Sequence, residues 1–180
     1  IMFEGPEGDL NLTENTQPAL MAVSMAVVRV LEQQGDLDLG TSCSFVAGHS
    51  LGEYSALTAA GALTLADTAK LLKLRGQAMQ RAVPVGVGSM AAILGLDYED
   101  VKEIAAAASG EEVCEAANDN SVGQVVVSGH KAAVAMAITL ATEKGAKRAV
   151  ELPVSAPFHC SLMQPAADEM AAALADAVIQ

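Results

Sequence analysis

A serine lies at the centre of a pentapeptide whose spacing is typical of enzymes that form acyl-serine esters. Residues 48–52 are Gly-His-Ser-Leu-Gly, which fits the G-x-S-x-G pattern. In that pattern the serine occupies a strained strand-to-helix turn, so that its hydroxyl projects from the end of a parallel sheet. The flanking glycines let two backbone segments approach closely. The pattern makes Ser50 the candidate nucleophile and the Leu51 N–H the candidate first donor of an oxyanion hole.

A serine hydroxyl is a weak nucleophile until a base removes its proton, and histidine can supply that base. The chain has three histidines. His49 adjoins the serine, and neighbours on such a turn cannot both face one reacting atom. His130 begins a predicted helix, where an exposed position is expected. His159 lies in a loop that precedes another predicted helix, and such loops often form active sites. We assign the base to His159, with a surface histidine as the alternative interpretation.

Arg75 is predicted to lie on the apolar face of a helix, because a helix turns by about 100° per residue. The stripe around it consists of Leu71, Leu72, Ala78, Met79 and Ala82. A guanidinium among apolar side chains is costly unless it is paired. Its partner is either a buried carboxylate of the chain or a carboxylate of the substrate. The serine motif favours the substrate.

The first part of the chain is predicted to contain three helices, at residues 16–34, 52–60 and 65–82. The first helix is expected to start at Thr16 and to bury a stripe of Leu20, Val23, Val27, Val30 and Leu31. Residues 44–48 are an apolar run that predicts a buried strand just before the serine. Thr64 and Asp67 resemble a capping box for the third helix.

Residues 87–152 follow the order β-α-β-β-α-β, which is typical of a ferredoxin-like subdomain. Strands are predicted at 89–95, 113–117, 124–128 and 146–152, and helices at 98–108 and 132–144. A last helix is predicted at 165–178. The fold class is therefore α/β, with a discontinuous catalytic core at 1–86 and 153–180 and an inserted subdomain at 87–152.

The composition limits the partners of the chain. Lys and Arg total 10 against 22 Asp and Glu, and the formal charge of −12 argues against nucleic acid or an anionic membrane as partner. Basic clusters at 70–81 and 144–148 are either an anion-binding patch or solvated helix faces, and the second is the simpler interpretation.

No apolar run approaches the about 18 residues of a membrane span, and no secretion signal is recognised, so a cytoplasmic location is expected. Cys43, Cys114 and Cys160 lack C-x-x-C spacing and predict neither a disulfide framework nor a zinc site.

Residues 48–57, Gly-His-Ser-Leu-Gly-Glu-Tyr-Ser-Ala-Leu, closely resemble the nucleophile segment of bacterial malonyl-CoA:acyl carrier protein transacylases. The resemblance covers essentially the whole chain. Further matching segments are Thr-Gln-Pro-Ala at 16–19, Arg-Gly at 75–76, Asn-Ser at 120–121, Gly-Gln-Val-Val at 123–126, Gly-His at 129–130, Pro-Phe-His at 157–159 and Leu-Met at 162–163.

The resemblance implies a step of fatty-acid biosynthesis, in which malonyl-CoA donates its malonyl group to a transiently bound acyl carrier protein. It implies that Ser50 carries the acyl group, that His159 acts as base and then as acid, and that Arg75 binds the malonyl carboxylate. Leu51 supplies an oxyanion donor, and Asn120 becomes a candidate substrate-binding residue. No cofactor or metal is implied. The oligomeric state stays open, with a monomer favoured.

The resemblance also implies an α/β-hydrolase-like parallel-sheet core with a ferredoxin-like insert. Phe158 resembles the malonyl-selecting version of the histidine loop. Family members begin with a strand and a Gly-Gln-Gly-Ser-Gln segment that supplies a second oxyanion donor, and they continue beyond the match to residue 180. Neither part is present in the sequence. We therefore expect these 180 residues to be inactive and unstable by themselves.

Two other functions are compatible with the sequence. A serine esterase or lipase uses the same turn and usually places an acid between serine and histidine, where Asp97, Asp100 and Asp119 are candidates. A non-catalytic ferredoxin-like binding module would explain residues 87–152. That module, however, gives no role to the Ser50 turn or to Arg75.

Overall fold

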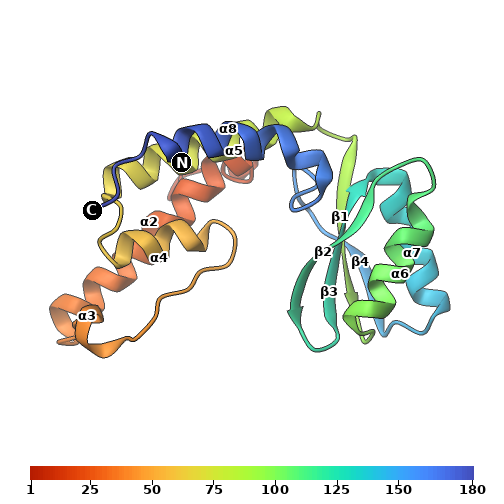
Figure 1. Cartoon of the computed structure of the whole chain (residues 1–180), viewed down its shortest axis with the longest axis horizontal. Coiled ribbons are helices and arrows are strands. Elements are labelled where there is room, and N and C mark those ends of the chain that lie inside the picture. The colour runs from red at the N-terminus through yellow and green to blue at the C-terminus, as the bar shows by residue number, and fades with distance from the viewer. The chain divides into compact units, whose positions relative to one another are not determined.

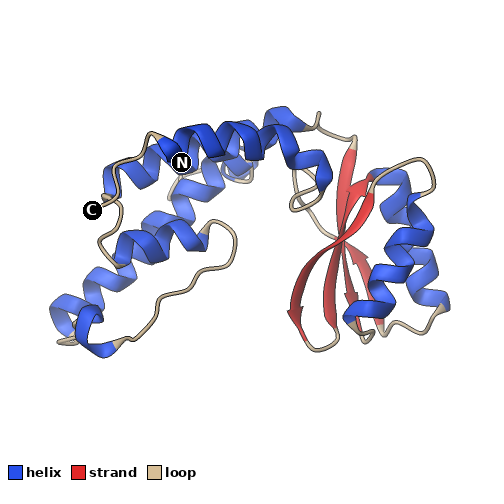
Figure 2. Cartoon of the chain, in the orientation of Figure 1, coloured by secondary structure: helices blue, strands red, loops and turns tan.

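The chain folds as two units, and the computed structural model describes all residues from 1 to 180. The helical unit contains Ile1–Ala78 and Glu169–Gln180, and the sheet unit contains Met79–Asp168. Every strand belongs to the sheet unit, whereas the helical unit consists of helices and loops (Figure 2). None of the helices combines the length and the hydropathy needed to cross a bilayer.

The sheet unit contains the elements expected from the sequence, in the expected order. They are β1 (Gly88–Leu94), α6 (Tyr98–Ser109), β2 (Cys114–Ser121), β3 (Gln124–His130), α7 (Lys131–Glu143) and β4 (Arg148–Glu151). Neighbouring strands are antiparallel, and their order across the sheet is β2-β3-β1-β4. The element ends differ from the expected ones by a few residues, as is usual for helix and strand termini.

The core of the sheet unit lies between the strands and helices α6 and α7, which cover the same face of the sheet (Figure 1). Ile93 of β1 and Val127 of β3 point to this face and are fully buried. They pack in one cluster with Val101 of α6 and Val134 of α7. Burying each such side chain contributes about 1.5–3 kcal/mol to the free energy of folding.

The helical unit is built from six helices, two of which continue from or into the sheet unit. They are α1 (Glu7–Leu10), α2 (Thr13–Gln34), α3 (Leu39–Ser42), α4 (Gly52–Ala59), α5 (Leu65–Ala82) and α8 (Gln164–Ala175). The predicted capping pair is confirmed: the Asp67 N–H donates to the Thr64 hydroxyl at 3.1 Å, and that hydroxyl donates to the Asp67 carboxylate at 2.7 Å.

Two small apolar clusters hold the helical unit together. In the first, Met21 and Met25 of α2 pack against Leu72 of α5. In the second, Leu71 of α5 packs with Met170 of α8, and α8 runs beside α5 (Figure 1). Tyr54 of α4 packs against both clusters and so joins them.

The buried face of α2 differs from the predicted face. The predicted stripe of Leu20, Val23, Val27, Val30 and Leu31 is between 46% and 54% exposed. The buried residues of α2 are instead Thr13, Gln17, Met21 and Met25, which recur every four residues. The prediction was wrong because α2 carries apolar side chains on more than one face. The face that is buried is the one with Met21 and Met25, which pack against Leu72 of α5.

The N-terminus of α2 also differs from the prediction. The helix begins at Thr13, one turn before Thr16. The Thr16 hydroxyl lies inside the helix, and its one hydrogen can be shared between the carbonyl oxygens of Leu10 and Leu12, at 2.5 and 3.1 Å. Threonine inside a helix commonly bonds to a preceding carbonyl in this way.

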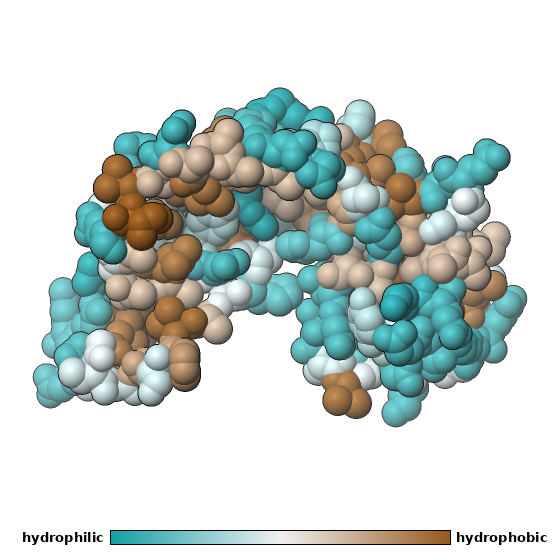
Figure 3. Space-filling view, in the orientation of Figure 1, coloured by the Kyte–Doolittle hydropathy of each residue, from teal (hydrophilic) through white to brown (hydrophobic).

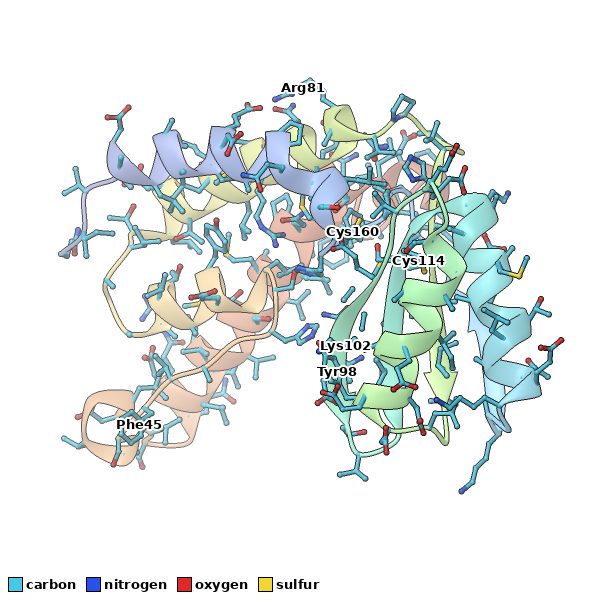
Figure 4. The ribbon with its side chains drawn as sticks, turned by 45° about the vertical axis from the view of Figure 1, so that its right-hand side comes forward. Phe45, Arg81, Tyr98, Lys102, Cys114 and Cys160 are labelled. Atoms are coloured by element: carbon cyan, nitrogen blue, oxygen red, sulfur yellow. The ribbon has the colours of Figure 1, made fainter.

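Residues 44–48, predicted to be a buried strand, form an exposed loop between α3 and α4. Phe45, on this loop, is 92% exposed (Figure 4). A strand requires a neighbouring strand to bond its backbone N–H and C=O groups. The helical unit contains no strand that could do so. The apolar run at residues 44–48 predicted a buried segment, but these residues are exposed.

Gly129 of β3 leaves room for the backbone of the adjacent strand. A Cβ at this position would collide with the carbonyl group of Val113 and with Cys114. We expect Gly129→Ala to lower the free energy of unfolding by roughly 1–3 kcal/mol, because the strands must move apart. Urea unfolding measures this change. Gly8→Ala is the control, since its Cβ would enter open space. Equal stability of the two variants would contradict the packing.

Candidate active site

Ser50 lies on a turn whose backbone is strained. Its φ of 55° is in the left-handed region, which few residues other than glycine adopt. The turn is closed by the Gly52 N–H, which donates to the His49 carbonyl at 2.9 Å, and by the Glu53 N–H, which donates to the Ser50 carbonyl at 3.2 Å. Helix α4 starts at Gly52, so its N-terminal N–H groups and positive dipole end lie beside the serine.

The tight turn depends on a missing side chain at Gly48. A Cβ there would collide with the backbone of Gly52 and Glu53. A Cβ on Gly52 would meet nothing within 4 Å. The close approach predicted for this motif is therefore present. It excludes a Cβ at Gly48, whereas Gly52 has room for one.

Arg75 of α5 reaches the candidate nucleophile. Its Nη2 donates to Ser50 Oγ at 3.1 Å, and its Nη1 donates to Gln17 Oε1 at 2.6 Å. The guanidinium carbon lies 5.8 Å from the centroid of the Tyr54 ring, within the range of a cation–π contact. Burial lowers the pKa of Arg75, but a guanidinium stays charged in proteins. A positive charge is thus held next to the serine hydroxyl.

The predicted apolar stripe around Arg75 is confirmed. Leu71, Leu72, Ala78 and Met79 are buried, and Ala82 is half-buried. Arg75 itself is half-buried. The stripe therefore removes part of the guanidinium from water, which is why its hydrogen-bond partners matter energetically.

Close contact between α2 and α5 brings Gln17 to Arg75. A Cβ on Gly76 would collide with the backbone of Thr13 and Glu14, so the glycine beside Arg75 lets the two helices touch. Gln17 is 3% exposed, and its Nε2 donates to the Thr13 hydroxyl at 2.9 Å. That bond orients the amide so that its oxygen faces the guanidinium.

Gln17 and Tyr54 are site residues that the sequence interpretation did not single out. Both lie within segments that carry the family resemblance. A further signal for Gln17 is its place in the four-residue row with Met21 and Met25, because a polar residue in a buried row must be hydrogen-bonded. That signal becomes readable only when the buried face of α2 is known.

His159 lies in the sheet unit, on the loop between β4 and α8, and its side chain is exposed. Its φ of 60° is again left-handed. On one side Pro157 is buried against Gly88, where a Cβ would collide with the proline ring. On the other side the Cys160 thiol donates to the Pro157 carbonyl at 3.2 Å. The backbone around His159 is therefore anchored, and the pairing of His159 with Ser50 stays a prediction.

The remaining predicted residues have different surroundings. Asn120 is exposed near the end of β2, and its substrate-binding role stays a prediction, as does the oxyanion role of Leu51. His130, expected to be exposed, is half-buried, because its Nδ1 accepts a hydrogen bond from the Val113 N–H at 2.9 Å. This contact gives His130 a structural role at the junction of β3 and α7.

Two of the three aspartates named as candidates for a hydrolase triad are engaged elsewhere. Asp97 caps α6 by accepting a hydrogen bond from the Asp100 N–H at 2.9 Å. Asp100 forms an ion pair with Lys144 at 2.6 Å. Asp119 is exposed on β2. These contacts weaken the esterase interpretation for Asp97 and Asp100, because each already stabilises the helices of the sheet unit.

Several lysines of the two basic clusters are paired with carboxylates. Lys70 pairs with Asp67 at 3.3 Å, and Lys73 pairs with Glu14 at 3.2 Å. Lys144 pairs with both Asp100 and Glu103. This pairing favours the interpretation of these residues as solvated helix faces. No group of three or more His, Cys, Asp or Glu side chains is arranged to hold a metal ion.

Sequence comparison assigns the chain to a known class of protein. Residues 1–180 match the family described as "Acyl transferase domain", and the chain belongs to that family. It is 50% identical over 172 residues to the malonyl CoA-acyl carrier protein transacylase of Escherichia coli K12, which covers 96% of this chain and 54% of the relative. The chain thus spans about half the length of the curated relatives it matches.

Solved structures give the same result. The crystal structure of an acyl-carrier-protein-S-malonyltransferase from Bartonella henselae matches with a TM-score of 0.93 and 60% identity, over 99% of this chain and 56% of that one. A type II PKS acyl-carrier protein in complex with its malonyl-transacylase matches with a TM-score of 0.92 and 45% identity, over 98% and 56% of the two chains.

The Gln17 amide can be tested as a support of Arg75. We expect Gln17→Leu to lower the free energy of unfolding by about 1–3 kcal/mol, because it leaves a buried part of the guanidinium without its acceptor. Chemical denaturation measures the loss. Gln33→Leu changes an exposed glutamine of the same helix and serves as control. A Gln17→Leu protein as stable as the control would show that the 2.6 Å contact contributes nothing.

Proposed function

We propose that this chain carries the acyl-transfer residues of a malonyl transferase. Malonyl-CoA donates its malonyl group to Ser50, and the phosphopantetheine thiol of an acyl carrier protein then receives it. The observation that carries the proposal is the 3.1 Å contact between Arg75 Nη2 and Ser50 Oγ. It holds a cation that can bind a free carboxylate beside the atom that would form the ester. The names of the relatives support both substrates.

In the first half-reaction His159 removes the proton of the Ser50 hydroxyl as the oxygen attacks the thioester carbon. The negative oxygen of the tetrahedral intermediate accepts a hydrogen bond from the Leu51 N–H. The C–S bond then breaks, and the imidazolium returns its proton to the departing CoA sulfur. Ser50 is left as the malonyl ester.

In the second half-reaction the carrier thiol gives its proton to His159 and attacks the ester carbonyl. The C–O bond to Ser50 breaks, and the serine oxygen takes the proton back from the imidazolium. The two halves share one covalent intermediate, so the kinetics are ping-pong. A transiently docked carrier is sufficient, because CoA has left before the carrier thiol reacts.

The contacts of Arg75 support selection of a malonyl group. Its two hydrogen-bond partners, Gln17 and Ser50, are neutral. Neither hydrogen bond neutralises the guanidinium, so a substrate carboxylate can still bind its N–H groups. An acetyl group offers no such partner. A site built for a charged group rejects an uncharged analogue by roughly 100-fold or more.

We further propose the finer fold: an α/β-hydrolase-like core at 1–86 and 153–180 with a ferredoxin-like subdomain at 87–152. The antiparallel order β2-β3-β1-β4, with both helices on one face, supports the subdomain. The proposal for the core is supported by residues 46–48. Together with α2 and α4 they line an apolar cavity of about 360 Å³, which is the kind of surface that packs against a sheet. Apolar side chains also reach the surface of the helical unit (Figure 3), as expected if a parallel sheet packs there.

The nucleophile is tested by mass spectrometry of the full-length protein after incubation with malonyl-CoA. We expect the mass of one malonyl group to be added to the wild type and none to Ser50→Ala, because the substitution removes the hydroxyl oxygen on which the proposed ester forms. Ser44→Ala, which changes an exposed serine of the preceding loop, should be acylated normally. An undiminished adduct on Ser50→Ala would remove Ser50 as nucleophile.

The role of Arg75 is tested by comparing malonyl and acetyl transfer. We expect Arg75→Ala to lower kcat/KM for malonyl-CoA by roughly 100-fold or more and to leave acetyl transfer nearly unchanged. Arg75→Lys should recover little, because an ammonium cannot form the two-edged contact. Arg81→Ala, on the exposed end of the same helix, is the control. Equal losses on both substrates would reject carboxylate recognition by Arg75.

A further inference from the structure

We infer that Glu115 of β2 is a positioning residue for His159, because its carboxylate holds the loop that presents the imidazole. We call residues 157–161 the histidine loop. The inference rests on the proposed role of His159 as the base. It concerns the sheet unit alone, since Glu115 and the whole loop belong to it.

Glu115 points away from the core of the sheet unit. Its neighbours Cys114 and Ala116 pack into the cluster beneath α6 and α7, and successive strand residues face opposite sides of a sheet. Across the strands Glu115 is paired with Ser128, which is paired in turn with Met90. Both of these partners are buried, so this second face of the sheet is also covered.

The histidine loop lies on this second face. Gly88 and Met90 alternate with the core-facing residues of β1, and Pro157 is packed on Gly88. Burial raises the pKa of the Cys160 thiol, and the charge of Glu115 adds to the rise. Cys114 and Cys160, which directly precede Glu115 and Ser161, lie toward the same end of the sheet in Figure 4.

Both carboxylate oxygens of Glu115 bind the end of the loop. Oε2 accepts a hydrogen bond from the Ser161 N–H at 3.0 Å, and Oε1 accepts one from the Ser161 hydroxyl at 2.6 Å. Ser161 begins the short 3-10 helix Ser161–Met163, where a backbone N–H has no partner within the helix. Glu115 therefore caps this helix from a strand 46 residues away in the sequence. The two hydrogen bonds fix the position and the orientation of Ser161 relative to β2.

His159 needs this anchor because its own backbone conformation is unfavourable. A left-handed residue other than glycine costs on the order of 1–3 kcal/mol and persists only where its surroundings fix it. Pro157 and Cys160 anchor the loop to one another and to β1, and Glu115 anchors it to β2. Without the second anchor, residues 159–161 can relax and carry the imidazole away from its working position.

If Glu115 only stabilised the fold, its removal would lower stability; if it positions His159, its removal lowers turnover instead. The Glu115–Ser161 contact is exposed to solvent, and exposed charged contacts add little to stability. Its loss should therefore leave the fold intact. In contrast, misplacing a catalytic group by about 1 Å can lower turnover by a factor of about 100.

The test measures malonyl transfer by the full-length enzyme. We expect Glu115→Ala to lower kcat by about 10- to 100-fold, with little change in KM for malonyl-CoA and in Tm. Glu115→Gln should restore most of kcat, because its amide can accept from the Ser161 N–H and donate to the Ser161 hydroxyl. Ser161→Ala should lower kcat less, and should add no further loss to Glu115→Ala. Glu111→Ala removes an exposed carboxylate near the start of β2 and should behave as wild type.

A wild-type kcat in Glu115→Ala would overturn the inference. So would a Glu115→Gln variant as slow as Glu115→Ala, because the hydrogen bonds would then not be what matters. If Glu115→Ala fails to fold, the comparison of Glu115→Gln with Ser161→Ala decides. Loss of activity in Ser50→Ala and His159→Ala alongside a normal Glu115→Ala would reject this inference alone, whereas normal activity in those two variants would reject the proposed function.

Discussion

A guanidinium taken partly out of water must have polar partners, and this requirement organises the helical unit. Arg75 lies within an apolar stripe of α5, and its partners come from α2 and from the turn before α4. The glycine beside it allows α2 to touch α5, and the buried row of α2 contains one amide where that amide is needed. Arg75 therefore connects three features of the helical unit: the contact between α2 and α5, the buried Gln17 and the position of the Ser50 hydroxyl.

Left-handed backbone at Ser50 and at His159 is fixed by different means in the two units. At Ser50 the constraint is steric and local, because Gly48 touches the backbone of Gly52 and short turn bonds close the loop. At His159 the constraint comes from residues distant in the sequence, Gly88 through Pro157 and Glu115 through Ser161. A strained conformation at either residue can persist only while these contacts are made.

The sequence was sufficient where local physics decides the outcome. Periodicity and capping residues predicted α4, α5 and the β-α-β-β-α-β order, and the stripe on α5 predicted the unusual position of Arg75. Prediction failed where a choice depends on a distant partner. The apolar faces of α2 are indistinguishable until Leu72 is known to meet one of them. Residues 44–48 have the composition of a strand but no strand beside them, and the Glu115–Ser161 contact joins residues that no local pattern connects.

The choice of an amide as the partner of Arg75 has a chemical consequence. A carboxylate in place of Gln17 would hold the guanidinium more strongly, but it would neutralise the charge and compete with the carboxylate of the proposed malonyl substrate. The Gln17 oxygen accepts one N–H, and the Gln17 nitrogen donates to Thr13, so the amide fixes the direction of the guanidinium without adding a negative charge beside it. The second N–H edge rests on the Ser50 hydroxyl, a weaker acceptor than a carboxylate. Under the proposed function, selectivity for a charged acyl group would then follow from hydrogen-bond partners that orient the guanidinium and leave it able to bind a carboxylate.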